Sequence, residues 1–361
     1  MIENIRSLQP LDGVNVLDLS QMIAGPAAAN ILGEWGASVV KVERPGGDPS
    51  RRLGIKDADD SQDLIFDVLN YNKQCIVRDL SGTDGREWLE AYLETADIVI
   101  VGLRPEASEK LGLGVDRLWE IKEDLIYIRL TGYSDWWGDV SRRGVDSILQ
   151  GESGLMSING ETSGRPMRVG VPVIDMCAAL AIVNAALASI LARERSGRGV
   201  YREISLIDSA LFLQTIPMAE FLNYGRPPSR NGNASPFAAP SDSYTAKDGD
   251  MSISAYLPNQ WETFCSLIDA EELLEDSRFS RNHLRVKYRE ELRILINEKL
   301  KKWTVEEWGD KFDRANIMWG RINGYQDMSE QIERAKRDGG PIRRVKFGNL
   351  DRWIVNVPGI G

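Results

Sequence analysis

The stretch Val14-Asn-Val-Leu-Asp-Leu-Ser-Gln-Met-Ile-Ala-Gly-Pro-Ala-Ala-Ala-Asn-Ile-Leu-Gly-Glu-Trp-Gly-Ala-Ser-Val-Val-Lys-Val-Glu43 decides the fold, because it reads as strand, helix and strand. Apolar β-type residues predict strands over 14–19 and 38–43. Between them, Pro26 suits the first position of a helix over 27–35. A βαβ unit of this kind favours a parallel sheet with a nucleotide half-site.

Two features beside this unit bear on what it binds. Glu43 lies at about the right distance to bind a ribose hydroxyl, but the first turn has a single glycine where a dinucleotide fingerprint has three. This argues against NAD. The next segment, Arg44-Pro-Gly-Gly-Asp-Pro-Ser-Arg-Arg52, carries guanidinium groups that suit phosphate. A solvated charged loop explains these arginines equally well.

Strands and helices continue to alternate, which predicts an α/β fold with an open, doubly wound (Rossmann-like) sheet that binds ligands at the carboxyl ends of its strands. Arg44, Lys73 and Arg104 lie near such ends or just before a strand. If they converge they would suit a phosphorylated adenosine, although each alone reads as a surface charge. The expected elements are strands over 75–80, 97–101 and 125–130 and helices over 85–95 and 115–124.

The second half of the chain predicts a smaller α+β domain. A strand over 199–206 and a helix over 208–223 precede a linker rich in Gly, Pro and Asn. Beyond it, an Asp-Gly turn joins two strands within 243–256, and charged helices follow over 260–313. We therefore expect a large α/β domain over 1–224, a small domain over 225–315 and a return segment to the large domain over 316–361.

One acid, Asp175, stands where the apolar run Val171-Pro-Val-Ile174 gives way to an alanine-rich helix that ends near Gly197. As an N-cap, its carboxylate would be held ionised by backbone N–H groups and the helix dipole. As a partly desolvated anion at the rim of a core, it would be a competent nucleophile. The residues alone leave both interpretations open.

Composition narrows the class of protein. A net charge of −10 argues against a nucleic-acid partner. Cysteines 75, 177 and 265 lack metal-ligand spacing, which favours a reducing, cytoplasmic setting. The apolar run Ala178 to Ala192 is shorter than the ~20 residues that cross a bilayer, so we expect a soluble protein without a membrane partner. The single histidine, His283, reads as a surface residue, which argues against His-based catalysis and histidine-rich metal sites.

With these features in place, the chain resembles the class III coenzyme A (CoA) transferases, the family of formyl-CoA transferase, carnitine CoA-transferase and α-methylacyl-CoA racemase. The resemblance covers almost the whole chain and is specific to the family rather than to one member. It rests on the segments 11–20, 24–26, 36–51, 72–73, 103–105, 131–133, 144–156, 248–249 and 260–261 together with the Asp175 segment.

The resemblance implies that Asp175 is the catalytic nucleophile of an enzyme that moves CoA from a donor acyl-CoA to an acceptor carboxylic acid. The reaction would pass through an aspartyl anhydride and an aspartyl-CoA thioester, with oxyanion donors expected near the helix start. It needs no metal and no permanently bound cofactor, because CoA and acyl-CoA are substrates. The family's CoA-binding positions match Met22, Ile23, Arg44, Asn72, Lys73, Gly102, Leu103, Arg104, Lys110 and Tyr133, whereas Thr131 replaces a lysine of formyl-CoA transferase.

Several alternatives stay open. The racemase branch uses a histidine where this chain has Val145, which disfavours racemization, although Asp146 or Glu152 would be candidate bases for another isomerase. A dehydrogenase and a catalytically silent partner subunit are the other readings, and retention of Asp175 argues against the silent subunit. The family forms interlocked dimers, so we expect a homodimer.

The substrate acid is not readable from the residues. The glycine-rich loop of formyl-CoA transferase is not visible, which argues against oxalate or formate. Arg321 would pair with the second carboxylate of a diacid, or is a surface residue. The segments expected to shape the acyl pocket are 150–154, 236–241 and 318–321.

Overall fold

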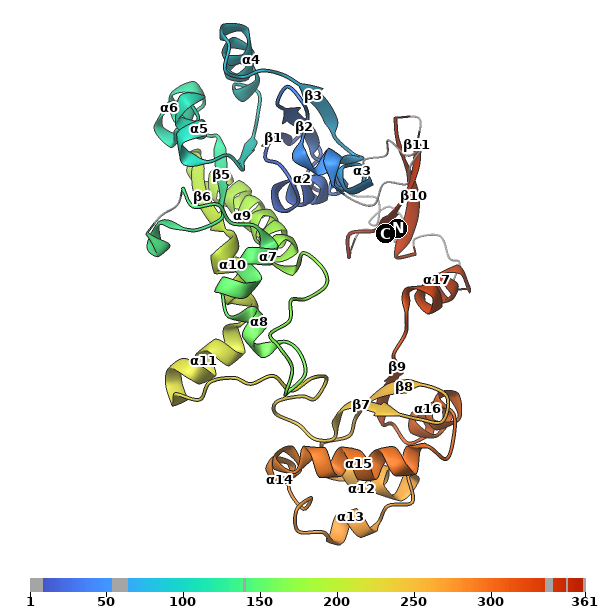
Figure 1. Cartoon of the computed structure of the whole chain (residues 1–361). Helices are drawn as coiled ribbons and strands as arrows, with labels where there is room; N and C mark the ends of the chain where they lie inside the picture. The colour runs from blue at the N-terminus through green and yellow to red at the C-terminus, as the bar shows by residue number, and fades with distance from the viewer. Residues whose placement is uncertain (1–8, 54–63, 139–140, 335–339, 349, 360–361) are drawn as a thin grey trace. The chain divides into compact units, whose positions relative to one another are not determined.

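The computed structural model describes residues 9–53, 64–138, 141–334, 340–348 and 350–359 (Figure 1). The chain divides into two compact units, and each is described by itself. The large unit comprises Met1–Met156, Arg168–Pro228 and Lys336–Gly361, and the small unit comprises Ser157–Met167 and Ser229–Ala335. The predicted boundary at residue 225 therefore lies close to the observed one. The predicted return segment over 316–361 is divided, because its first part belongs to the small unit.

The large unit is built on a six-stranded parallel sheet in the order β3-β2-β1-β4-β5-β6. The chain starts at the centre of the sheet, runs to one edge, returns to the centre and runs to the other edge. This order confirms the predicted doubly wound sheet, and its direction reverses between β1 and β4. The strands are β1 (Asn15–Leu19), β2 (Ser38–Glu43), β3 (Gln74–Val77), β4 (Ile98–Val101), β5 (Ile126–Thr131) and β6 (Val200–Ser205).

Helices cover both faces of the sheet, because its central strands are apolar on both sides. Alternate residues, such as Val16 and Ile98, pack with α2 (Ala24–Glu34) and α9 (Val173–Ser196). The intervening residues, such as Leu17, pack with helices on the opposite face. The remaining helical segments of this unit are η1 (Pro49–Arg52), α3 (Leu64–Asn70), α4 (Thr83–Leu93), α5 (Pro105–Lys110), α6 (Val115–Ile121), η2 (Asp135–Trp137), α7 (Asp146–Glu152), α10 (Leu206–Leu213) and α11 (Thr215–Tyr224), with α8 (Leu155–Ile158) at the boundary.

The central helix α9 begins earlier than the sequence predicts. Pro172 is its N-cap, and Asp175 is the third helical residue and makes no capping hydrogen bond. The prediction that Asp175 caps the helix is therefore wrong. Val173 and Ile174 read as strand residues, but the Ile174 N–H finds an acceptor in Asp146 at 2.8 Å, so the helix can start before the aspartate.

Helix α9 has 24 residues, so it extends beyond the apolar run Ala178 to Ala192 at both ends. Among the described residues it is the one helix long and apolar enough to cross a membrane by length and composition alone. Its residues Ile182 and Ala186 lie in the core against α2 and the sheet. Buried core helices of globular domains pass the same test of length and composition.

Two other helices differ from prediction. Helix α2 starts at Ala24, so Pro26 is its third residue rather than its first. Proline is tolerated there because the N–H groups of a first turn have no intrahelical acceptor. The expected helix over 208–223 is two helices, α10 and α11, which meet at Gln214. The Ser205 hydroxyl caps the first of them by accepting the Asp208 N–H at 3.1 Å.

The small unit combines a three-stranded antiparallel sheet with helices. Strands β7 (Ser241–Thr245) and β8 (Asp250–Ser254) form the predicted hairpin, and β9 (Met318–Arg321) pairs with β8. Helix α16 (Val305–Arg314) starts with a capping box of Thr304 and Glu307 and buries Trp308 and Phe312. The other helices are α12 (Pro258–Leu267), α13 (Glu272–Glu275), α14 (Asn282–Lys287), α15 (Arg289–Leu300) and α17 (Tyr325–Arg334). His283, on α14, is exposed as predicted.

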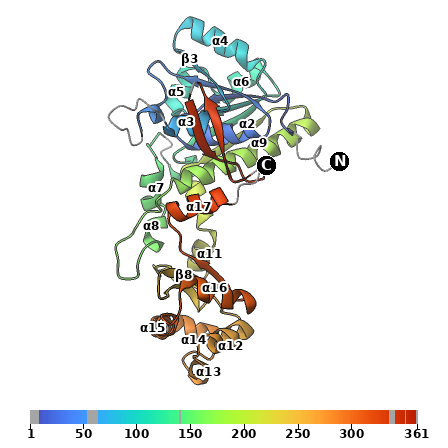
Figure 2. The ribbon, with the colours of Figure 1, turned by 90° about the vertical axis from the view of Figure 1, so that its right-hand side faces the viewer.

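A C-terminal hairpin returns to the large unit. Its strands are β10 (Ile342–Phe347) and β11 (Leu350–Val355), and they lie beside α3 in both views (Figures 1 and 2). Arg352 of β11 donates to Asp67 of α3 at 2.7 Å, and both side chains are largely buried. Buried ion pairs of this kind fix one docking geometry.

A buried ionic network joins the carboxyl ends of β1 and β2 to Lys73, the residue before β3. The Lys41 ammonium lies 3.0 Å from Asp48 Oδ2 and 3.9 Å from Asp18 Oδ2 and donates to the Ser20 carbonyl at 2.9 Å. The Lys73 ammonium donates to Asp18 Oδ2 at 2.9 Å. Burial alone would raise the pKa of Asp18, but the two lysines outweigh it and lower this pKa to about 2.

Glu43, which lies at about the right distance along the chain for a ribose acceptor, is hydrogen-bonded within the protein. It is buried and accepts two hydrogen bonds from the Arg51 guanidinium, at 2.7 and 2.8 Å, and one from the Asp48 N–H at 2.9 Å. These bonds join the loop after β2 to the ionic network. Glu43 therefore has its hydrogen-bond partners within the protein, and the argument against NAD stays a prediction.

The network generates a prediction about stability. Lys41→Met leaves Asp48 and part of the Asp18 charge buried without a partner, and should lower the free energy of unfolding by roughly 3–5 kcal/mol. Urea denaturation followed by circular dichroism measures the change. The matched control is Arg117→Met, which breaks an exposed 2.7 Å pair with Glu90 in the same unit and should leave the urea midpoint nearly unchanged. Equal midpoints for both variants would show that the network does not stabilise the fold.

Candidate functional site

A cavity of about 450 Å³ opens in the large unit where the strand order reverses. Doubly wound sheets bind their ligands at this point, because the loops after the two neighbouring strands diverge there. The cavity is lined by the loop after β1, the loop after β4, the exit of β5, the loop before α7, and Asp175 of α9. The lining residues are Gln21, Met22, Ile23, Ala24, Gly102, Leu103, Arg104, Pro105, Leu130, Thr131, Gly132, Arg142, Arg143, Gly144, Val145, Asp175 and Leu206.

The loop after β1 is held in a strained conformation by the ionic network. Met22 has a φ of 71°, which non-glycine residues rarely adopt, and its N–H donates to Asp48 Oδ1 at 3.2 Å. The neighbouring Ser20 packs so closely on Gly102 that a Cβ there would lie 2.9 Å from the Ser20 Cβ. A glycine is therefore required at the end of β4. These contacts hold the two cavity loops against each other.

Asp175 forms part of the cavity wall and is 9% exposed. Burial is the main cause that raises the pKa of its carboxyl group to about 7, and the charge of Asp146 adds to the rise. Among the described residues, none donates a hydrogen bond to this carboxylate. An anion without donors in a poorly hydrated place is more basic and more nucleophilic than a solvated carboxylate.

The start of α9 also bears on where an oxyanion would be stabilised. The Ile174 N–H is already bound to Asp146, and the Met176 N–H donates to the Pro172 carbonyl at 3.0 Å. Neither group is free for a substrate oxygen in this arrangement. The predicted oxyanion donors at the helix start are therefore not found at these two positions.

Half of the predicted CoA-binding positions line the cavity. Met22 and Ile23 come from the loop after β1, and Gly102, Leu103 and Arg104 come from the loop after β4. They share one cavity with Asp175. Their roles toward CoA stay a prediction.

The other predicted positions do not line this cavity. Arg44 is exposed on the loop after β2, and Asn72 donates to the Asn30 carbonyl at 2.9 Å. Lys73 is buried, and its ammonium also has acceptors in the Pro26 carbonyl at 2.7 Å and Asn70 Oδ1 at 2.9 Å. Burial lowers the pKa of Lys73 to about 8 despite the pairing with Asp18.

Lys110 and Tyr133 complete this group. Lys110 is exposed at the end of α5 and lines a separate hollow with Arg86 and Glu90. Tyr133 is buried, and its hydroxyl donates to Glu152 Oε2 at 2.6 Å while the Arg142 guanidinium lies over its ring. Of the three basic groups Arg44, Lys73 and Arg104, Arg104 is the one that lines this cavity, and a joint role for them stays a prediction.

Sequence reasoning missed the arginines that the structure places in the cavity. Arg142 and Arg143 directly precede the Gly144-Val-Asp146 segment. Both arginines line the cavity together with Asp175, and Arg142 also pairs with Glu152. Two adjacent arginines beside a matching family segment were the signal that could have identified them.

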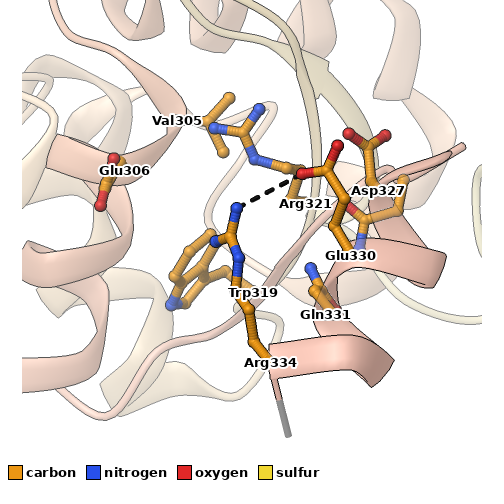
Figure 3. Close-up of a pocket in the computed structure, with 9 residues that line it drawn as sticks. Val305, Glu306, Trp319, Arg321, Asp327, Glu330, Gln331 and Arg334 are labelled. Carbon is orange, nitrogen blue, oxygen red and sulfur yellow. Dashed lines mark hydrogen bonds and ion pairs between the residues drawn. The ribbon is translucent and has the colours of Figure 1, made fainter.

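The small unit contains a cavity of its own, of about 500 Å³ (Figure 3). Arg334 lies beside Trp319 and pairs with Glu330 at 3.3 Å, and the Arg321 side chain extends toward Val305 (Figure 3). Arg321 therefore belongs to this cavity, and its predicted pairing with a diacid stays a prediction. Among the described residues no group of three or more His, Cys, Asp or Glu side chains is placed to hold a metal ion.

The unusual state of Asp175 predicts a gain in stability when its charge is removed. The folded pKa of about 7 lies above the ordinary aspartate value of 3.8. This contribution to wild-type stability is therefore fully present below pH 3.8 and is lost as the pH rises to 7. Asp175→Asn should avoid this loss and be more stable than wild type at pH 8. Its free energy of unfolding minus that of wild type should be larger at pH 8 than at pH 4 by on the order of 3–4 kcal/mol. Thermal and urea unfolding at the two pH values measure it. A variant that loses stability at pH 8 would show that unseen donors stabilise the carboxylate.

Comparison with known proteins agrees with this geometry. The chain matches CoA-transferase family III over residues 11–351. It is 33% identical to an acyl-CoA transferase of Fusarium pseudograminearum, covering 91% of this chain and 74% of that protein. It is 31% identical to the succinyl-CoA:glutarate CoA-transferase of Mus musculus, covering 91% of this chain and 75% of that protein.

Solved structures show the same relationship. A CAIB/BAIF family protein from Brucella suis superimposes with a TM-score of 0.83 at 29% identity, covering 97% of this chain and 92% of that one. Rv3272 from Mycobacterium tuberculosis superimposes with a TM-score of 0.84 at 30% identity over the same shares of the two chains. The family match spans both units, and the likeness of fold extends along nearly the whole chain. The chain therefore belongs to CoA-transferase family III.

Proposed function

We propose that this CoA-transferase moves CoA from an acyl-CoA to a carboxylic acid through covalent intermediates on Asp175. The Asp175 carboxylate attacks the thioester carbonyl, forming a mixed anhydride and releasing CoA thiolate. The thiolate attacks the aspartyl carbonyl, which gives an aspartyl-CoA thioester and frees the donor acid. The acceptor carboxylate then attacks this thioester, and the returning thiolate cleaves the new anhydride to form the new acyl-CoA and regenerate Asp175.

The observation that carries this proposal is a buried carboxylate in the wall of the cavity at the strand-order reversal, to which no described residue donates a hydrogen bond. Nucleophilic attack needs the ionised form of Asp175. Because its pKa is about 7, turnover should fall as the pH drops below that value. Desolvation costs energy in the resting enzyme and makes the free carboxylate more reactive.

The cavity also supports an assignment of substrates. We assign CoA to the loops after β1 and β4, where Arg104 suits its phosphates. Arg142 and Arg143 suit the charged end of an acid. Relatives are named for glutarate, mesaconate and oxalate, all of which are dicarboxylates. A dicarboxylic acid is therefore our proposed acceptor.

Two alternatives within the family receive less support. Val145 lines the cavity at the position where a racemase carries its proton-transferring histidine, and its side chain cannot carry a proton. A silent partner subunit has no need for a desolvated carboxylate, which costs stability. Neither nucleic acid nor a membrane takes part in the proposed reaction.

We further propose that the chain forms an interlocked homodimer in the cytoplasm. The described residues include apolar side chains exposed along α9, α10 and α11, namely Leu180, Leu191, Phe212, Ile216, Leu222 and Tyr224. Exposed apolar surface of this extent is typical of protein interfaces. The free cysteines 75, 177 and 265 favour a reducing compartment, which cell fractionation can test. Sedimentation equilibrium should give twice the 40.4 kDa chain mass, whereas a monomer at micromolar concentration would contradict the homodimer.

The covalent step can be tested by mass spectrometry. Wild-type protein and Asp175→Ala are incubated with a panel of acyl-CoA thioesters and then with hydroxylamine, which converts an aspartyl anhydride or thioester into a hydroxamate. The wild type should gain about 15 mass units on the peptide that contains Asp175, and the variant should gain none. Asp208→Ala, which removes an acid on the neighbouring helix α10, serves as a labelling control.

The same preparation identifies the acceptor. Dicarboxylates should discharge the aspartyl-CoA thioester faster than monocarboxylates of equal length. Absence of labelling with every acyl-CoA, in protein that still binds CoA, would contradict the proposed nucleophile.

A further inference from the structure

Asp146 connects the loop before α7 to the helix that carries the nucleophile. It is the first residue of α7, and α7 packs against α9. Its Oδ2 accepts the Ile174 N–H at 2.8 Å, one residue before Asp175. Pro172, the N-cap of α9, offers no side-chain acceptor to the free N–H groups of the first turn. Asp146 supplies that acceptor from another helix.

Gln150 extends this connection to the segment that leads into α9. Its side-chain amide donates to Asp146 Oδ1 at 2.7 Å, and its Oε1 accepts the Val169 N–H at 2.8 Å. Gln150 is buried, so these bonds are shielded from water. Residues 169–174 are thus held at both ends by side chains of α7.

We propose that Asp146 is a positioning residue, which holds the first turn of α9 and with it the Asp175 carboxylate against the cavity. The inference rests on the proposed function, because it concerns the same nucleophile. Asp146 itself does not line the cavity, whereas the preceding residues Gly144 and Val145 do. It acts through Ile174 rather than on the substrate.

The same placement gives Asp146 an electrostatic role. Burial and then the Asp146 charge raise the pKa of Asp175. Acylation removes the Asp175 charge, as protonation does, so like-charge repulsion should favour the acylated enzyme over the free carboxylate. Asp146 would therefore place the nucleophile and also promote its conversion into the covalent intermediate.

The elements that contact α9 carry other charged groups, and most of these have partners of their own. Glu34 on α2 pairs with Arg343, Glu152 on α7 with Arg142, and Glu203 on β6 with Arg129 of β5, while the Asp208 carboxylate on α10 accepts from Ser205. The remaining basic groups are Arg104 and Arg143 at the cavity and Arg202 on β6.

Two variants separate placement from charge. Asp146→Asn removes the charge and keeps one oxygen for the Ile174 N–H, but it gives up the bond from the Gln150 amide. Asp146→Ala removes the charge and both acceptors. We expect Asp146→Asn to shift the acid limb of kcat to lower pH by roughly one unit. Asp146→Ala should in addition lower kcat about tenfold or more, with little change in KM for acyl-CoA. Asp116→Asn, which removes an exposed acid from the first turn of α6, is the matched control and should leave the profile unchanged.

A readout that does not require turnover keeps the test independent of the proposed function. Infrared difference spectra of wild type against Asp175→Asn report the protonated Asp175 carboxyl band as a function of pH. Its midpoint should move to lower pH in Asp146→Asn even if transfer activity proves absent. If wild type forms the Asp175 hydroxamate while both Asp146 variants keep the wild-type pH profile, band midpoint and kcat, the inference is wrong. If Asp146→Ala does not fold, Asp146→Asn alone decides it.

Discussion

The placement of Lys41 between two buried carboxylates is the constraint on which the site depends. Its ammonium lies within 3.0 Å of Asp48 and donates to the Ser20 carbonyl at the end of β1. Asp48 in turn holds Met22 in its left-handed conformation. A charge network buried at the carboxyl ends of the strands thus fixes the loop that forms one wall of the cavity. Removal of one partner would leave the others charged and buried.

The environment of Asp175 is the opposite of that of the buried acids in the ionic network. Asp18 is paired with lysines and has a lowered pKa, whereas Asp175 has no donor in the described part of the chain and has a raised pKa. The paired acid stabilises the fold, and the unpaired acid costs stability but is poised to react. Such an opposition between carboxylates is typical of enzyme sites, in which a functional group is kept in an unfavourable state by a rigid surrounding. Asp146 contributes to that surrounding both as an acceptor for the helix start and as a like charge.

The doubly wound sheet and a ligand site at the carboxyl ends of its strands could be predicted because they follow from local patterns. Apolar runs marked the strands, and the alternation with helices implied ligand binding at their carboxyl ends, where Met22 and Arg104 lie. The predictions failed where long-range contacts decide. Lys73 reads as a surface cation until the fold brings Asp18 to it, 55 residues away in the chain. The start of α9 depends on an acceptor 28 residues upstream, Asp146, which no pattern around Asp175 reveals.

The central claim is that the Asp175 carboxylate exchanges an oxygen with the substrate acids during transfer, and isotope transfer tests it most directly. The enzyme is supplied with an acyl-CoA and an acceptor acid whose carboxylate carries ¹⁸O, and the peptide containing Asp175 is then weighed. In the proposed mechanism one acceptor oxygen stays on the aspartate after each cycle, so the peptide should gain about two mass units in the first turnover and about four after many. Formation of the new acyl-CoA with no ¹⁸O in Asp175 would contradict the account, because CoA would then have moved without an aspartyl anhydride.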